Sequence, residues 1–254
     1  MDYRRIIPCL DTKNGWLVKG VHFVDVKELG DPAEAAGAYS AAGADELVFL
    51  DITATLEGRK TFLEAVGRTV AACTVPLTVG GGIASLDDIR TLLDLGVAKV
   101  SMNSAAVRDP EIVRSAAEKL GSERVTVAID TRRNEAMPSG FEVVVSGGTR
   151  PAGLDAIEWA AKVDALGAGA ILPTSMDTDG VRTGYDIPMT RAVVQAVKAP
   201  VIASGGAGAL EHLAEAITEA GADAVLVASI AHYGTFTSRQ MKEYLAGQGI
   251  PVRL

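Results

Sequence analysis

The chain has 254 residues, of which 48% are hydrophobic and 22% are charged, and its formal net charge is −8. This composition is typical of a folded globular protein with a sizeable core. No apolar run approaches the ~20 residues of a membrane span, no signal peptide is recognisable, and the acidic charge argues against nucleic acid as a general partner. We therefore expect a cytoplasmic protein that binds neither membranes nor nucleic acids.

The cysteines and histidines give no indication of a metal site or a disulfide framework. Cys9 and Cys73 lie far apart in the sequence and form no CxxC motif. The histidines, at positions 22, 212 and 232, do not have the spacing of metal ligands and follow no strong strand pattern. We therefore predict neither a bound metal ion nor a histidine-based nucleophilic triad.

Short apolar runs recur along the chain and alternate with amphipathic helical stretches. Several runs are continuously apolar, which is typical of parallel strands that are buried on both faces. Helix boundaries lie between them, since Asp31-Pro32 is an N-cap followed by proline, and Ser85 with Asp88 opens a later helix. We predict strands at residues 5–10, 46–51, 77–79, 99–102, 125–130, 170–174, 201–203 and 224–227.

Eight strands that each precede a helix predict an α/β fold, the (β/α)8 TIM barrel. An open doubly wound sheet would need a different glycine-rich turn after the first strand, which residues 11–15 do not form. The chain also repeats itself, which indicates two fused half-barrels at about residues 1–123 and 124–254. Neither half can close alone, so we expect a single domain over residues 1–254. The similar segments are 43–50 and 167–174, 76–83 and 200–207, and 96–104 and 221–229.

Two connections are long, at residues 12–30 after the first strand and at about 131–151 after the fifth. Both leave the C-terminal face of the barrel, where the active sites of this fold lie, and loops of this length are usually functional. Glycine pairs in the second loop make a small hairpin or lid plausible there. Lys19, which lies between Gly15 and Gly20 in the first loop, could close over a ligand at the mouth.

Two aspartates end strands that lie on opposite sides of an eight-stranded ring. Asp11 ends the first strand and Asp130 ends the fifth. Each could simply cap the turn that follows it. Carboxylates that face each other across the mouth nevertheless favour paired acid–base work on a substrate held between them. We therefore predict Asp11 and Asp130 as the catalytic residues.

Glycine-rich turns follow the third and seventh strands, at Gly80–Gly82 and Ser204–Gly206. Glycine allows backbone N–H groups to approach an anion closely, and a helix N-terminus adds a favourable dipole. Asn103-Ser104 and Ala228-Ser229 follow the fourth and eighth strands, and Asp179-Gly180 can add a contact to the second group. Because the arrangement is duplicated, we predict two phosphate sites and a substrate that is phosphorylated at both ends.

Together these motifs resemble the cyclase subunit of imidazole glycerol phosphate synthase, from histidine biosynthesis, over essentially the whole chain. The resemblance implies that ammonia condenses with a bis-phosphorylated ribulosyl-formimino carboxamide nucleotide. The adduct then cyclises and splits into imidazole glycerol phosphate and an aminoimidazole carboxamide ribotide. The matching segments are 5–11, 18–20, 43–53, 78–83, 99–101 with Asn103, 127–130, 174–177 with Asp179-Gly180, 184–186, 202–208 and 242–245.

The resemblance also implies roles for individual residues. Asp11 and Asp130 match the general acid–base pair, and Lys19 matches a lysine of the first loop. One phosphate site would include Gly82, Asn103 and Ser104. The substrate site would further include Thr174, Asp179, Gly180, Ser204, Gly205, Gly206, Ala228 and Ser229, most of them at the second phosphate. No metal or organic cofactor is implied, and ammonia would come from a glutaminase subunit that docks at the N-terminal face as a heterodimer.

The sequence departs from the family at that N-terminal face. Arg5, Glu46 and Lys99 match three members of a charged ring that would gate ammonia, but the fourth position, usually Glu, is Ala170. The family also usually carries Asp where this chain has Ala98. We expect the two bases to share Glu46 and the floor to be looser, with water or an anion in place of the missing carboxylate.

Three other functions compete with the cyclase. The sister isomerase of the same pathway shares the barrel, the repeat and both carboxylates, but needs neither ammonia nor a charged floor. A cyclase-like amidotransferase subunit could act on another sugar. A catalytically inactive barrel could bind a phosphorylated ligand or a glutaminase, although the presence of both carboxylates and both phosphate turns argues against it.

Overall fold

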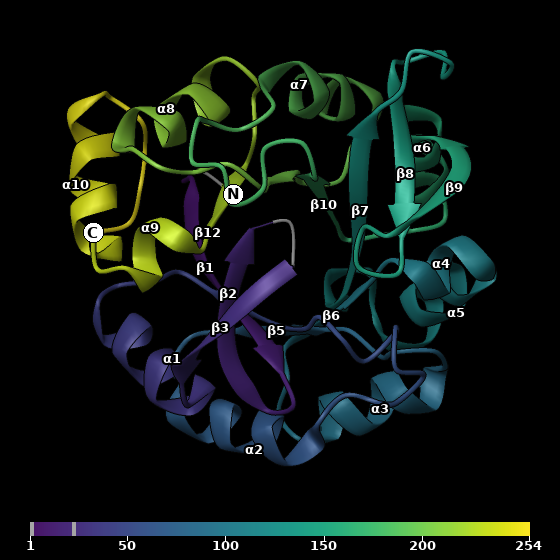
Figure 1. Cartoon of the computed structure of the whole chain (residues 1–254), viewed down its shortest axis with the longest axis horizontal. Coiled ribbons are helices and arrows are strands. Elements are labelled where there is room, and N and C mark those ends of the chain that lie inside the picture. Colours follow the sequence, from purple (N-terminus) through teal and green to yellow (C-terminus); the bar gives the residue numbers. More distant parts are fainter. Residues whose placement is uncertain (1–2, 22–23) are drawn as a thin grey trace.

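The computed structural model describes residues 3–21 and 24–254, without the side chains of residues 19–21 and 24–26. Within these residues, eight parallel strands form a ring that is seen end-on in Figure 1. The ring consists of β1 (Arg5–Lys13), β4 (Leu47–Asp51), β5 (Leu77–Gly80), β6 (Lys99–Met102), β7 (Val125–Arg133), β10 (Ala170–Ser175), β11 (Ile202–Ala203) and β12 (Ala224–Val227).

The strand pairing confirms the predicted TIM barrel. β1 pairs with β12 on one side and with β4 on the other, and the ladder continues through β5, β6, β7 and β10. Two bridges, Ile171 to Val201 and Thr174 to Ser204, join β10 to β11 and close the ring. All eight predicted strands are present, although β1 and β7 continue beyond their predicted ends to Lys13 and Arg133.

The helices lie outside the ring and cover it (Figure 1). Asp31 caps the first of them by accepting from Ala33 N, and Ser85 caps the third by accepting from Asp88 N, as the sequence predicted. No helix in the part of the chain that the structure describes is long and apolar enough to cross a bilayer. The helices are α1 (Pro32–Ala41), α2 (Leu63–Ala72), α3 (Leu86–Asp94), α4 (Ser104–Arg108), α5 (Glu111–Leu120), α6 (Ala156–Ala165), α7 (Ile187–Ala196), α8 (Leu210–Thr218), α9 (Ser229–His232) and α10 (Ser238–Gly247), with a 3-10 turn, η1 (Ser122–Arg124).

Two antiparallel hairpins extend the barrel at its mouth. β2 (Trp16–Val21) and β3 (Val24–Gly30) follow β1, and β8 (Phe141–Val145) and β9 (Arg150–Asp155) follow β7. The second hairpin was expected, whereas the first was predicted only as a long loop. Each half of the chain thus has four barrel strands, a hairpin after the first strand and a short helix after the fourth. This correspondence supports the two-half repeat, and the division near residue 123 stays a prediction.

Side chains fill the lower part of the ring. A buried apolar cluster includes Ile7, Cys9, Val48, Leu172 and Leu226, from strands on different sides of the barrel. Larger clusters pack the outer faces of the strands against the helices. Because the interior is packed below its mouth, in keeping with the layered core of this fold, a pocket forms at the C-terminal ends of the strands.

Candidate active site

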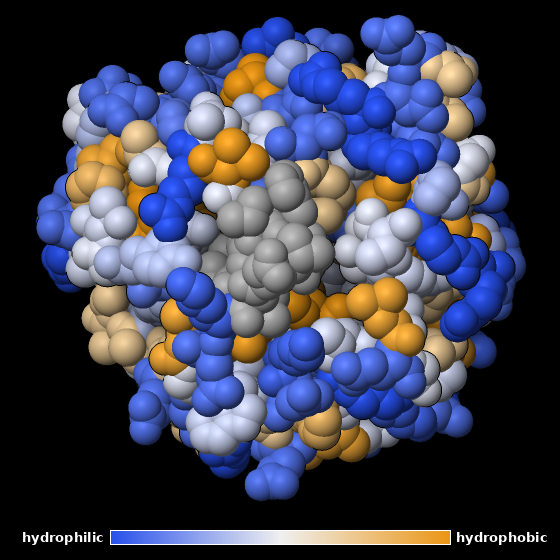
Figure 2. All heavy atoms as spheres, in the orientation of Figure 1, coloured by the Kyte–Doolittle hydropathy of each residue, from blue (hydrophilic) through white to orange (hydrophobic). Residues whose placement is uncertain are grey.

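A cavity opens to solvent at the mouth of the barrel. Figure 2 shows a hollow near the centre of this face, bordered by hydrophobic side chains and surrounded by hydrophilic ones. Its apolar lining includes Leu50, Leu172 and Leu226, and its polar lining comes from strand ends and from the loops that follow them. A concave, largely apolar pocket with a few convergent polar groups is the usual form of a small-molecule site.

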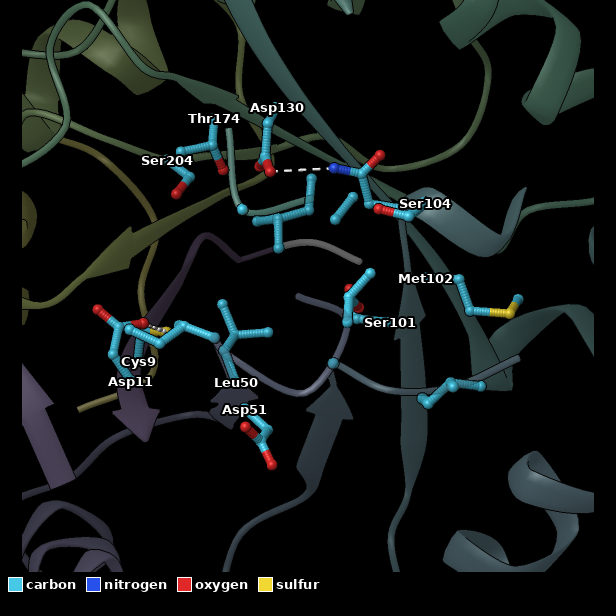
Figure 3. Close-up of a pocket in the computed structure, with 18 of the residues that line it drawn as sticks. Cys9, Asp11, Leu50, Asp51, Ser101, Met102, Ser104, Asp130, Thr174 and Ser204 are labelled. Atoms are coloured by element: carbon cyan, nitrogen blue, oxygen red, sulfur yellow. Dashed lines mark hydrogen bonds between the residues drawn. The ribbon is translucent and has the colours of Figure 1, made fainter. Parts of the chain in front are cut away.

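Asp11 and Asp130 line this cavity from opposite sides. They lie on β1 and β7, which are separated by β4, β5 and β6 in one direction and by β10, β11 and β12 in the other. Figure 3 shows the carboxyl groups of Asp11 and Asp130 on different sides of the pocket. Asp11 is only 4% exposed, and the thiol of Cys9 donates to its Oδ1 at 3.4 Å. The structure therefore places the two predicted catalytic residues at one pocket.

Asp130 can hold a proton near neutral pH. Burial raises the pKa of its carboxyl group to about 7, against the effect of a hydrogen bond from Asn103, and the negative charges of Asp179 and Asp11 raise it further. Asn103 Nδ2 donates to Asp130 Oδ2 at 3.0 Å and to Val144 O at 3.3 Å. A group with a pKa near the working pH can both give and accept a proton, which suits general acid–base catalysis.

The residues predicted for the first phosphate site lie at one side of the cavity. Gly82, Asn103 and Ser104 line it together. Gly82 has φ +72°, and a Cβ there would lie 2.8 Å from Ala54 Cβ, so the turn requires glycine. The N–H of Gly82 donates to Thr55 Oγ1 at 3.5 Å, a long and therefore weak hydrogen bond. Thr55 was not predicted as part of this site.

Most of the residues predicted for the second phosphate site lie around a smaller, separate cavity. This cavity and the main one share Asp179, Leu226 and Ala228, so they are adjacent. Thr174 and Ser204 line the main cavity instead. The smaller cavity is lined by Asp179, Gly180, Gly205, Gly206, Ala207, Leu226, Ala228 and Ser229. The glycine turn of the first half thus lines the main cavity and that of the second half lines the smaller one, and glycine turns of this kind can bind anions through backbone N–H groups.

Lys19 lies on β2, opposite Lys27 on β3. Its side chain belongs to the part of the chain that the structure does not describe. The position of its backbone on the hairpin after β1 agrees with the expected first loop, and its closure over a ligand stays a prediction.

The charged floor lies at the N-terminal ends of the strands. Arg5 Nη1 donates to Glu46 Oε1 at 2.5 Å, and Lys99 Nζ donates to Glu46 Oε2 at 2.7 Å. The two bases therefore share Glu46, as predicted from the sequence. Ala170 is 7% exposed and packs in the apolar interior cluster. The hydration of this floor and its role as an ammonia gate stay predictions.

One polar contact near the pocket was not anticipated from the sequence. Asp51, which ends β4, is 2% exposed and receives two hydrogen bonds from Arg59, at 2.5 and 2.8 Å. This bidentate pair connects the two ends of the loop after β4. The position of Asp51 at the end of a strand could have indicated a role at the pocket, whereas nothing in the sequence indicated that Arg59 would be its partner.

Among residues 3–21 and 24–254, no group of three or more His, Cys, Asp or Glu side chains is placed to hold a metal ion. Among known protein families, the model of the family described as "Histidine biosynthesis protein" matches residues 5–237 of the chain.

Proposed function

The chain belongs to the histidine biosynthesis protein family, whose members are isomerases or lyases of that pathway, and we propose that it is the ammonia-dependent cyclase. In this reaction ammonia condenses with a bis-phosphorylated ribulosyl-formimino aminoimidazole carboxamide nucleotide. The adduct closes an imidazole ring and splits into imidazole glycerol phosphate and aminoimidazole carboxamide ribotide. Each product keeps one of the two phosphates.

The observation that carries this proposal is the placement of two opposed carboxylates between two glycine-lined concavities. Asp11 and Asp130 line the central cavity, Gly82 lies at one side of it, and Gly206 lines the adjoining smaller cavity. A substrate with a phosphate at each end could be held at both turns, which would leave its reacting centre between the carboxylates. Holding reactants in a productive geometry is itself a large part of catalysis.

The acid–base chemistry follows from the two environments. Condensation of ammonia with a carbonyl group needs one group that accepts a proton from nitrogen and one that gives a proton to the departing oxygen. Asp130, with its pKa raised to about 7 by burial, is suited to exchange a proton at this step. Asp11, on the opposite side of the cavity, would complete the pair.

The charged floor favours the cyclase over the sister isomerase. The isomerase would use the same carboxylates and the same two anion sites, but it has no need for a small neutral reactant to enter from below. Arg5, Glu46 and Lys99 form hydrogen-bonded ion pairs under the interior of the barrel. We propose that ammonia from a glutaminase partner at the N-terminal face passes this group, and that Ala170 widens the passage.

A product assay with the purified chain separates these functions. The bis-phosphorylated nucleotide in its ketose form is supplied with an ammonium salt at alkaline pH, and substrate loss and products are followed by chromatography. Formation of both monophosphorylated products with ammonia, and of neither without it, supports the cyclase. The aldose form is supplied in a parallel reaction, and its conversion into the ketose form identifies the isomerase instead. Binding without turnover of either form would indicate an inactive barrel.

A further inference from the structure

Two threonines outside the predicted site make the same contact in the two halves of the barrel. Thr61, in the loop after β4, donates its hydroxyl hydrogen to the carbonyl oxygen of Gly81. Thr178, in the loop after β10, donates to the carbonyl oxygen of Gly205 at 3.1 Å. β4 and β10 are the second barrel strands of their halves, and both glycines lie in the turn after the third strand. In each half a threonine hydroxyl thus holds a carbonyl of this turn, but from a different position of the loop, because Thr178 lies three residues after β10 and Thr61 lies ten residues after β4.

Each contact fixes the direction of the next backbone N–H. The described peptide bonds are all trans, and in a trans peptide the carbonyl oxygen and the following N–H point in opposite directions. When Thr61 holds the carbonyl of Gly81, the N–H of Gly82 points away from Thr61 and toward Thr55 Oγ1 at 3.5 Å, and Gly82 and Thr55 both line the main cavity. By the same geometry Thr178 orients the N–H of Gly206, which lines the smaller cavity.

These turns need an external anchor because glycine has little conformational preference of its own. Gly81 and Gly82 have φ +93° and +72°, and Gly205 and Gly206 have φ +87° and +109°. Such a pair can rotate its central peptide at low steric cost. A rotated peptide would present a carbonyl oxygen to an anion, which repels it, in place of an N–H, which binds it.

Both hydroxyl groups lie against the turns that they contact. Thr61 is only 7% exposed, and its hydroxyl lies against the turn. Thr178 also lies 3.4 Å from the carbonyl of Ser175, a longer and weaker contact than the one to Gly205. We propose that Thr61 and Thr178 are positioning residues, each of which holds one glycine turn with its N–H directed at a bound phosphate. The identity of the phosphorylated substrate rests on the proposed function, but the anchoring can be tested with inorganic phosphate alone.

The experiment follows the amides of Gly82 and Gly206 in ¹⁵N-labelled full-length protein during titration with inorganic phosphate. In the wild-type chain both amide signals should shift. Thr61→Val keeps the shape of the side chain and removes the hydroxyl, so the phosphate affinity reported by Gly82 should fall about tenfold while that reported by Gly206 is unchanged. Thr178→Val should show the reverse pattern, and Thr61→Ser and Thr178→Ser should restore binding.

The unaffected glycine in each variant reports that the barrel is folded. Wild-type affinity at Gly82 in Thr61→Val, or an equal loss at both glycines in either valine variant, would overturn the anchoring. An absence of phosphate-dependent shifts at both glycines of the wild-type chain would overturn the anchoring together with the phosphate sites. If the variants behave as expected but ammonia-dependent cyclisation is absent, the anchoring stands and the proposed function fails.

Discussion

Replacing Asp130 with asparagine should stabilise the folded protein at pH 8 and have much less effect at pH 4. Burial raises the pKa of this carboxyl group to about 7, from an ordinary value of 3.8 in the unfolded chain. Below pH 4 the group is protonated in both states and costs the fold little. As the pH rises to about 7, the unfolded chain loses the proton first, so the wild-type fold loses stability. Asparagine is neutral throughout and removes this loss.

The size of the effect follows from the two pKa values. The distance between 3.8 and about 7 corresponds to about 4 kcal/mol as an upper limit. The carboxyl group borders an open cavity, where solvent reduces the cost of its charge, so we expect about 2 kcal/mol. The amide oxygen of the variant can still accept from Asn103 Nδ2, which donates to Asp130 Oδ2 at 3.0 Å in the wild type. The donor group of Asn103 therefore keeps its partner.

The assay is urea unfolding of the wild type and of Asp130→Asn at pH 4, 6 and 8. Glu142→Gln is the matched control, because hydrogen bonds from Asn134 and Arg132 hold the pKa of Glu142 below its ordinary value. That variant should lose stability at pH 8, and the loss should shrink as the pH falls below about 4.5. If the stability gain of Asp130→Asn were the same at all three pH values, or were a loss at pH 8, the reasoning about burial would be refuted.

Three further predictions concern activity, anions and the floor. Asp11→Asn and Asp130→Asn should each lower ammonia-dependent turnover by about 10²–10⁴-fold in steady-state assays while circular dichroism stays unchanged, and near-wild-type turnover in either would remove its catalytic assignment. Crystals grown in sulfate should show anion density at the N–H groups of both Gly82 and Gly206, and density at one turn alone, even with the bis-phosphorylated substrate, would contradict a two-ended substrate. Ala170→Glu should leave turnover with saturating ammonia within about twofold of wild type, since ammonia then reaches the pocket from solvent; a large loss would show that the floor does more than admit ammonia.

The barrel strands could be predicted because parallel strands that are buried on both faces leave continuous apolar runs in the sequence. Even β11 (Ile202–Ala203) was found, since Pro200 and Ser204–Gly206 bound its short run. The hairpin β2–β3 was missed although Val24 and Val26 alternate with polar residues, a period-two signal that a long polar loop concealed.

The duplicated glycine turns could also be predicted, because the sequence repeat placed them on opposite sides of the mouth. The partners that hold them could not. Thr61 and Thr178 lie in loops of different sequence, and a lone loop threonine carries no signal of the carbonyl that it will meet. The raised pKa of Asp130 could not be predicted from the sequence either, since it depends on burial among residues that lie far apart in the chain.

Incorporation of labelled nitrogen tests the central claim most directly. The purified chain is incubated with the bis-phosphorylated ketose nucleotide and ¹⁵N-ammonium at alkaline pH, and the products are analysed by mass spectrometry. The cyclase proposal predicts one ¹⁵N atom in imidazole glycerol phosphate and none in the aminoimidazole carboxamide ribotide, with equal amounts of the two products. Unlabelled products, or recovery of the substrate only as an isomer of equal mass, would contradict it.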